Sequence, residues 1–237
     1  MKYIKSKKYN VKEINERIMG PNPIKLQEEL LKDCPLKEGA TVMDLGSGMG
    51  VTSLYLAKEH KFRVFAADLW SEPTDNMRFF EEMGLTSKQI IPIKADANNL
   101  PFAKEFFDGV VCTDSYHYYG FDESFLGEKL LPFVKKGGYI YICIPGMKVD
   151  CHHDIPDTLL LSWTPEQLDT IHDIPYWEKI IKKTAGIEVS LTEMEINMEA
   201  WEDWLKTDNP YAIQDRKAMY NGGDKYLNFI AIKIKKL

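Results

Sequence analysis

Three glycines at alternate positions are the clearest chemical feature of the sequence. The run Val42-Met43-Asp44-Leu45-Gly46-Ser47-Gly48-Met49-Gly50 passes from apolar residues through an acidic one into these glycines, and a helical segment follows. A strand, a tight glycine turn and a helix start leave backbone N–H groups unblocked, so that an anionic or polar ligand can approach closely. The run therefore predicts a binding loop for a nucleotide-like cofactor.

The glycine spacing indicates which cofactor the loop serves. A dinucleotide fingerprint requires its third glycine where this chain has Val51, and a P-loop requires a Gly-Lys-Ser/Thr sequence that does not follow. The pattern Asp-x-Gly-x-Gly-x-Gly instead resembles the first motif of the class I S-adenosylmethionine (SAM) dependent methyltransferases. An ordinary turn between strand and helix, with glycine used only for tight packing, is the alternative.

The resemblance implies roles for the residues of this loop. Gly46, Ser47, Gly48 and Gly50 would pass under the methionine part of SAM. Asp44 would help to hold the amino group of SAM or the water bound there. The cofactor would leave the site as S-adenosylhomocysteine.

Composition limits the class of protein. The chain has 237 residues, 44% of them hydrophobic and 28% charged, which fits one soluble α/β domain with additions. The net charge of −6 argues against a nucleic-acid-binding surface over the whole molecule. No apolar stretch approaches the roughly 20 residues that span a bilayer, and the basic N-terminus lacks the apolar core of a secretory signal. We therefore expect a cytoplasmic location.

Short apolar segments alternate with helical ones after residue 40. Strands are expected at 41–45, 63–68, 90–94, 109–113 and 139–144, and helices at 52–59, 75–83 and 124–134. This alternation predicts a parallel sheet wound on both faces. Ligands of such sheets bind beyond the carboxyl ends of the strands, so those ends are where chemistry is expected.

An acidic residue ends the second expected strand. Asp68 lies 24 positions after Asp44, a spacing at which a carboxylate can bind both hydroxyls of a ribose held over the glycine loop. Leu69 and Trp70 come next and would pack against the adenine face.

Three further segments extend the resemblance in the family's order. Residues 94–102 resemble its D-A-x-x-L-P-F segment, which implies that Asp96 accepts from the adenine amino group and that the N–H of Ala97 meets the ring. Residues 107–112 resemble its F-D-x-V entry to the fourth strand. Residues 131–139 resemble its L-K-P-G-G turn, with Lys136 where proline is usual; the two glycines still make the turn. The resemblance covers residues 41–144.

The cluster after the fourth strand is where the resemblance places the methyl group and its acceptor. We assign Thr113 and Asp114 to the cofactor side, and Tyr116, His117 and Tyr118 to catalysis, with His117 facing the acceptor as a base or an orienting partner. The alternative is that the tyrosines are the packing face of a loop.

This strand end also argues against one substrate class. DNA amine methylation uses an Asn/Asp-Pro-Pro-Tyr motif there, which this chain lacks. The similar-looking run 208–211 lies near the C-terminus and is expected to be a turn outside the site.

The cysteines give no metal-ligand pattern. None of the four, at positions 34, 112, 143 and 151, belongs to a C-x-x-C pair, and Cys112 and Cys143 lie in apolar runs expected to be core strands. The run Cys151-His152-His153-Asp154 has the right residue types, but neighbours in a chain rarely point to one centre. We expect no metal.

The segments before and after residues 41–144 must determine the substrate. Residues 1–38 are expected to be a helical extension with helices at 11–18 and 24–31, which either covers a sheet edge or acts as a lid over the cofactor. Residues 39–145 would form the cofactor-binding core. Residues 146–237 would add helices at 159–166, 176–184 and 201–205, and strands at 187–198 and 226–235.

These elements predict one domain with a definite architecture. The resemblance implies that it is a Rossmann-like, doubly wound α/β fold with a seven-stranded sheet, mostly parallel, whose C-terminal hairpin forms an antiparallel edge. The expected activity is methyl transfer from SAM to a small-molecule acceptor. The alternatives are an RNA or protein methyltransferase and a non-catalytic SAM-binding module. We expect no DNA or membrane partner, and either a monomer or a homodimer.

Overall fold

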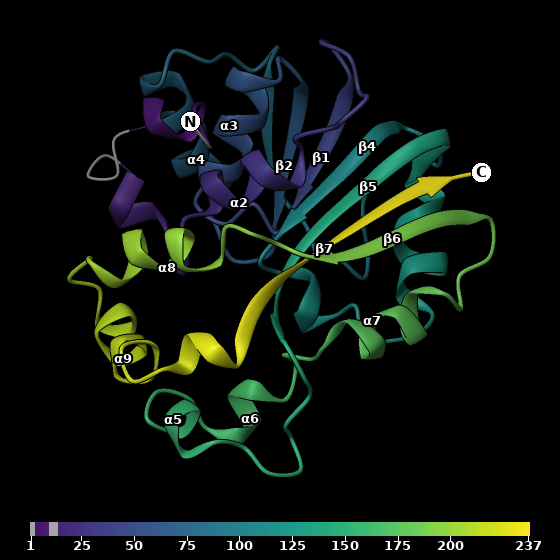
Figure 1. Ribbon diagram of the computed structural model, residues 1–237. Helices are drawn as coiled ribbons and strands as arrows, with labels where there is room; N and C mark the ends of the chain where they lie inside the picture. Colours follow the sequence, from purple (N-terminus) through teal and green to yellow (C-terminus); the bar gives the residue numbers. More distant parts are fainter. Residues whose placement is uncertain (1–2, 10–13) are drawn as a thin grey trace.

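A seven-stranded sheet forms the centre of the computed structural model, which describes residues 3–9 and 14–237 (Figure 1). The strands are β1 (Thr41–Leu45), β2 (Arg63–Asp68), β3 (Ile90–Lys94), β4 (Phe107–Thr113), β5 (Val134–Met147), β6 (Ile187–Glu193) and β7 (Leu227–Lys236). Their order across the sheet is β3-β2-β1-β4-β5-β7-β6. The pairs among β1 to β5 are parallel, and β7 runs antiparallel between β5 and β6. The expected α/β architecture, with its antiparallel hairpin edge, is confirmed.

Helices cover both faces and one end of this sheet. They are α2 (Pro23–Leu30), α3 (Val51–Glu59), α4 (Pro73–Glu82), α5 (Asp157–Leu160), α6 (Pro165–Leu168), α7 (Ile174–Ile181), α8 (Asn197–Leu205) and α9 (Pro210–Met219). Short 3₁₀ turns lie at η1 (Ser6–Lys8), η2 (Asn15–Arg17), η3 (Tyr116–Tyr118), η5 (Leu131–Phe133) and η6 (Gly223–Lys225), and η4 (Phe125–Leu130) is a π-helix. In the described residues, no helix has the length and apolar character that crossing a membrane requires.

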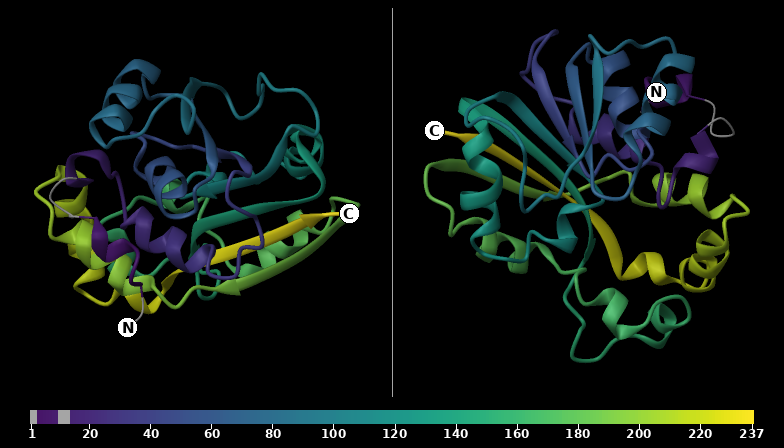
Figure 2. Two further views of the ribbon diagram at one scale, coloured as in Figure 1. Left: turned by 90° about the horizontal axis from the view of Figure 1, so that it is seen from above. Right: turned by 180° about the vertical axis from the view of Figure 1, so that it is seen from behind.

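The sheet separates two apolar clusters because neighbouring strand residues point to opposite faces. Val42 and Val64 belong to the cluster that α2, α3, α4 and α8 cover. Met43 and Phe65 belong to the other cluster, which η4 and α7 cover. The ribbons of Figure 2 show the helices on the two faces of the sheet and the group α5, α6 and α9 beyond one end of it. The carboxyl ends of the parallel strands thereby lie between the segment that precedes β1 and the segments that follow β5.

Several boundaries differ from the sequence-based expectation for local physical reasons. The expected strand 187–198 ends at Glu193, because α8 begins at Asn197. The run 208–211 is not a simple turn: Asn209 accepts from the N–H of Tyr211 and caps α9, with Pro210 in its first turn. The expected helix 124–134 is a π-helix followed by a 3₁₀ turn. Of the expected helix 11–18, residues 11–13 lie outside the described residues, and Asn15–Arg17 is a 3₁₀ turn.

Candidate active site

A cavity of about 830 Å³ lies at the carboxyl ends of the first four strands. Its lining comes from the segments after β1, β2, β3 and β4 and from the N-terminal segment before α2, with residues 45–49, 51–52, 67–71, 95–98, 113–115, 118–119, 17–21 and 23. This volume falls in the usual range for small-molecule and cofactor sites. The cavity therefore has the size and the position that a cofactor site on such a sheet requires.

The glycine loop makes room for a ligand rather than offering free donors. Gly46 and Gly48 have positive φ angles of 76° and 51° and line the cavity. The N–H groups of Gly46 and Ser47 donate to Ala67 O at 2.9 and 3.2 Å, and that of Gly48 donates to Asp68 Oδ2 at 2.8 Å. The N–H groups of these three loop residues are therefore not unblocked as expected, because the end of β2 binds them. In the described residues, no acceptor is bound to the N–H groups of Val51 and Thr52 at the start of α3. Ser47 Oγ is buried without a hydrogen-bond partner in the part of the chain that the structure describes.

Gly50 and Asp44 lie behind the cavity wall. Gly50 caps α3 with a φ of 90°, and a Cβ there would lie 2.6 Å from the Phe80 ring, so this glycine permits helix packing and does not line the cavity. Asp44 is fully buried and accepts from Thr52 Oγ1 at 2.6 Å and Ser53 Oγ at 2.5 Å. Burial raises the pKa of Asp44 to about 6, although these two hydrogen bonds oppose the shift. The carboxylate therefore reaches the cavity only through Thr52, which does line it.

Asp68 holds two loops together at the end of β2. Its Oδ2 accepts from the N–H of Gly48, and its Oδ1 accepts from the N–H groups of Trp70 and Ser71 at 2.9 and 2.8 Å. Three backbone donors fix the carboxylate at the cavity edge. Leu69 and Trp70 also line the cavity, and Trp70 is 85% exposed.

Asp96 and Ala97 lie at the end of β3 and line the cavity as well. Asp96 Oδ1 accepts from the N–H of Asn98 at 2.8 Å, which forms a tight turn. The exposed carboxylate keeps its second oxygen available to a ligand, because no hydrogen bond to Oδ2 occurs within residues 3–9 and 14–237.

An N-terminal strap, residues 17–23, closes one side of the cavity. Arg17 Nη1 donates to Met49 O at 3.2 Å, and its guanidinium lies 3.9 Å from the centre of the Phe79 ring. Behind the strap, the buried Gln27 of α2 donates to Thr113 Oγ1 at 3.2 Å. The expected helical extension thus supplies part of the cavity wall. The spacing of its apolar residues predicted helices that form a lid or an edge cover, but no motif identified these lining residues.

Asp114 is the most unusual residue of the site. It has a positive φ of 58°, a strained region for a residue other than glycine, and its half-buried side chain lines the cavity. Among the described residues, no hydrogen bond or salt bridge to its carboxylate occurs. Burial first, and the charge of Asp215 second, raise its pKa to about 7. A carboxylate of this kind can bind a cation or take up a proton.

Two of the three residues predicted to be catalytic do not face the cavity. Tyr116 has no exposed surface, and its ring packs against Phe125 and Trp177. His117 is 3% exposed, and burial lowers its pKa to about 3, which makes it neutral and a weak base. The prediction that His117 faces the acceptor is therefore wrong: the η3 turn directs it into the protein. Tyr118 does line the cavity and is 66% exposed.

The lining suits a ligand that carries positive charge. Asp68, Asp96 and Asp114 are its carboxylates, whereas Arg17 is the only basic residue that the described lining contains. SAM carries a sulfonium and an ammonium group, so the charge of this lining, its volume and the unpartnered Ser47 hydroxyl fit that cofactor.

Comparisons with known proteins show a likeness to methyltransferases. Residues 42–138 match the family described as "Methyltransferase domain". A fibrillarin-like rRNA/tRNA 2′-O-methyltransferase of Methanococcus voltae is 30% identical over 149 residues, which are 60% of this chain and 62% of that protein.

Two solved structures share the fold at low sequence identity. One is phosphoethanolamine N-methyltransferase 2 of Haemonchus contortus, with a TM-score of 0.71 and 17% identity over 100% of this chain and 58% of the other. The second is geranyl diphosphate C-methyltransferase of Streptomyces coelicolor, with a TM-score of 0.69 and 16% identity over 90% and 78% of the two chains. The chain thus spans about three fifths of the curated relative and of the Haemonchus enzyme. Residues 42–138 therefore match a methyltransferase domain, and the chain shares the fold of these two methyltransferase structures.

Proposed function

We propose that this protein transfers the methyl group of SAM to a small-molecule amine, and that Asp114 binds the amine and takes its proton. The observation that carries the proposal is the Asp114 carboxylate, which lines the cavity with no hydrogen-bond or ionic partner among the described residues. An ammonium group would supply the missing partner. The charge of Asp215 adds to the same negative potential.

The raised pKa of Asp114 suits proton transfer from an amine. An amine becomes a nucleophile only after it loses its proton, and a base works best when its pKa lies near the operating pH. Asp114, with a pKa of about 7, can hold the ammonium as a carboxylate and then accept its proton. Bound SAM supplies an electrophilic methyl group, and the chain's part is to align the amine nitrogen with it and to exclude water.

The cofactor contacts of this proposal follow the strand ends. Asp68 accepts from the ribose hydroxyls, Asp96 accepts from the adenine amino group through its available oxygen, and Ser47 Oγ donates to the methionine carboxylate. The support is that all three residues line one cavity. Ser47 Oγ and Asp96 Oδ2 have no hydrogen-bond partner among the described residues, and Asp68 lies at the edge of the cavity.

An RNA acceptor is the second candidate, because the Methanococcus relative is named as an rRNA/tRNA 2′-O-methyltransferase. The net charge of −6 and the single arginine of the described lining disfavour a phosphate backbone at the cavity mouth. A small amine is favoured by the Haemonchus structure, whose bound phosphomonomethylethanolamine is an amine.

Methyl transfer from labelled SAM to matched acceptor sets tests the proposal. The sets are primary and secondary amines, the alcohols with the same carbon skeletons, and a transcribed tRNA. We expect label in one or more amines and none in the matched alcohols. Label that enters only the alcohols or only the tRNA would overturn the amine assignment, and SAM binding without label in any set would favour a non-catalytic module.

A further inference from the structure

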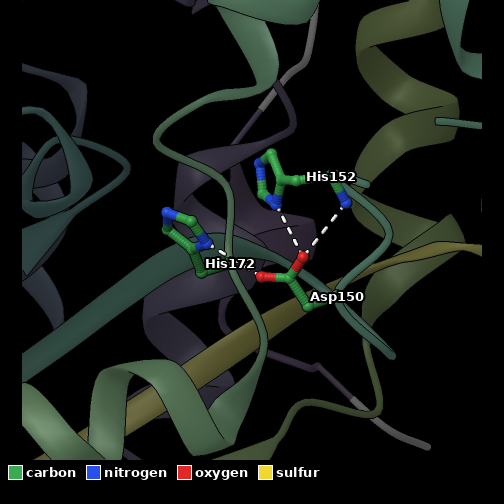
Figure 3. A group of neighbouring side chains, drawn as sticks. All are labelled: Asp150, His152 and His172. Carbon is green, nitrogen blue, oxygen red and sulfur yellow. Dashed lines mark hydrogen bonds and ion pairs between the residues drawn. The ribbon is translucent and has the colours of Figure 1, made fainter. Parts of the chain in front are cut away.

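Three side chains from two separate segments meet beyond the end of β5 (Figure 3). Asp150 and His152 follow β5, and His172 precedes α7. Asp150 Oδ1 lies 2.8 Å from His152 Nδ1, and Asp150 Oδ2 lies 3.0 Å from His172 Nδ1. One donor atom from each residue lies within 4.8 Å of the other two. None of the three lines the cavity at the glycine loop, so this His-Asp-His cluster is a separate feature.

The hydrogen bond of His152 Nε2 indicates that the cluster requires a cation. His152 Nε2 lies 3.0 Å from Leu168 O, and because a carbonyl oxygen only accepts, Nε2 carries the hydrogen. In a neutral ring, Nδ1 then has a lone pair that points at Asp150 Oδ1, which is also an acceptor. Two acceptors 2.8 Å apart repel unless a cation lies between or beside them. That cation is either a proton on His152 or a metal ion.

The surroundings hold the three donors in place. The ring of His172 stacks on Tyr176 with centroids 3.5 Å apart and an interplanar angle of 17°. The carbonyl of His172 accepts from the N–H of Met147 at 3.1 Å, which attaches this segment to the end of β5. Asp150 Oδ1 also accepts from the backbone N–H of His152 at 3.1 Å. The side chains of Asp150, His152 and His172 are 34%, 22% and 14% exposed, so an ion can reach a site that is already partly assembled.

We propose that Asp150, His152 and His172 bind a divalent transition-metal ion, with Zn²⁺ as the best match. Two imidazoles and one carboxylate form a common zinc ligand set, and a fourth position remains for water. The bond from His152 Nε2–H to the Leu168 carbonyl is the outer contact that zinc-binding histidines ordinarily make. Tetrahedral bonds to zinc separate neighbouring ligand atoms by about 3.3 Å. The ligand atoms of the three residues lie within 4.8 Å of one another, so they reach this separation by shifts of at most about 1.5 Å.

The ion would connect two segments that the chain separates by about 20 residues. It would tie the loop after β5 to the start of α7. In the sheet, β5 lies next to β4, which is one of the four strands whose ends form the cavity. Cys151 lies outside the cluster, and its Sγ contacts Met147 Sδ at 3.6 Å. His153 is exposed and outside the cluster, which makes it a matched control.

Zinc binding by the full chain tests the proposal. After removal of metals with a chelator, Zn²⁺ is titrated in competition with a chromophoric chelator against wild type, His152→Ala, His172→Ala and His153→Ala. We expect one tightly bound ion per chain in wild type, at least about 100-fold weaker binding in the first two variants, and unchanged binding in His153→Ala. The melting temperature of wild type should rise with added Zn²⁺, and that of His172→Ala should not.

Two results would overturn the zinc site. If wild type binds no stoichiometric ion, a proton on His152 satisfies the cluster. If His172→Ala binds Zn²⁺ as wild type does, the ion lies elsewhere. Should the alanine variants fail to fold, X-ray absorption on zinc-loaded wild type decides instead: two imidazoles and oxygen ligands support the proposal, and sulfur ligands contradict it.

Discussion

The two sides of the cavity differ in how their carboxylates are satisfied. On the cofactor side, Asp68 accepts from three backbone N–H groups, and Asp96 accepts from its own turn. Asp114, which the sequence assigned to the cofactor and which we propose binds the acceptor, has no such partner in the described residues and has a positive φ angle. The first set is preorganised by the fold, whereas the second is left for a ligand to complete.

This difference predicts that the two kinds of carboxylate contribute differently to stability and to reactivity. A satisfied carboxylate stabilises the loops that it connects and changes little when a ligand arrives. An unsatisfied, desolvated one destabilises the native state and stays reactive. Substitutions on the two sides should therefore have different effects on folding, SAM affinity and turnover.

Asp114→Asn should have the largest effect on turnover. The amide keeps the shape of the side chain but cannot take a proton, so we expect turnover to fall by about 10²- to 10⁴-fold while SAM affinity stays nearly unchanged. In wild type, kcat/KM should rise as pH increases through about 7, where Asp114 becomes a carboxylate, and the variant's residual activity should lack this step. Labelled methyl transfer across pH 5 to 9 and calorimetry with SAM measure both.

The same variant should be more stable than wild type at high pH. The native pKa of Asp114 lies above the unfolded value of about 3.9, so the native state binds more protons between these values, and its stability decreases as pH rises from about 4 to 7. Asp114→Asn removes this loss. Its melting temperature should exceed that of wild type at pH 8 and match it near pH 4. A variant that is less stable at pH 8 would contradict the unsatisfied state of Asp114.

Asp68→Ala should have the largest effect on the cofactor side. It removes the carboxylate that accepts from Gly48, Trp70 and Ser71, together with the proposed ribose contact. We expect SAM binding to weaken by about 1.5 to 3 kcal/mol, roughly 10- to 150-fold. Calorimetry measures this loss, with Asp75→Ala as the control, because Asp75 is exposed and does not line the cavity. Unchanged affinity in a folded Asp68→Ala protein would remove Asp68 from the cofactor site.

The sequence predicted the first three strands and the positions of their ends well, because this geometry is local. Strands 41–45, 63–68 and 90–94 match the observed β1, β2 and β3, and the residues directly after each one line the cavity. A strand end and the turn that follows are encoded by adjacent residues, so a motif can reveal them. What the motif did not reveal is that β2 uses the loop's N–H groups, since that depends on a neighbouring strand.

The directions of the side chains after β4 and β5 were not predicted, because turn geometry and contacts with distant segments determine them. The cluster 113–120 has the right residue types, but the tight η3 turn decides that Tyr118 faces the cavity and His117 does not. Likewise, the run of residues 151–154 drew attention to His152, whereas its partners are Asp150 and the distant His172. The residue types alone do not specify the direction in which each side chain points.

Two substitutions at Asp96 should give a smaller effect that still discriminates between models of the cofactor side. Asp96→Asn keeps one acceptor oxygen for the adenine amino group, whereas Asp96→Ala keeps none. We expect roughly tenfold weaker SAM binding for the alanine variant and a smaller loss for asparagine. Calorimetry on both variants checks the order, and equal affinities would show that the Asp96 side chain does not contact the cofactor.

Gly20→Ala should have the smallest effect, and it should be confined to the acceptor side. A Cβ at Gly20 would lie 2.9 Å from Asp114 Oδ2, so the strap or the carboxylate must move by a few tenths of an ångström. Because alignment of the acceptor depends on Asp114, we expect turnover to fall by about threefold to tenfold, with SAM affinity and melting temperature unchanged.

Gly127→Ala is the matched control, since its Cβ would make only ordinary contacts with Thr184 at 3.5 Å. Steady-state kinetics and calorimetry on the two glycine variants separate the possibilities. A loss of SAM affinity in Gly20→Ala would mean that the strap serves the cofactor as well, and the division between the two sides of the cavity would then not hold at residue 20. Full turnover would mean that Asp114 tolerates this displacement, so that its charge matters to the reaction more than its position does.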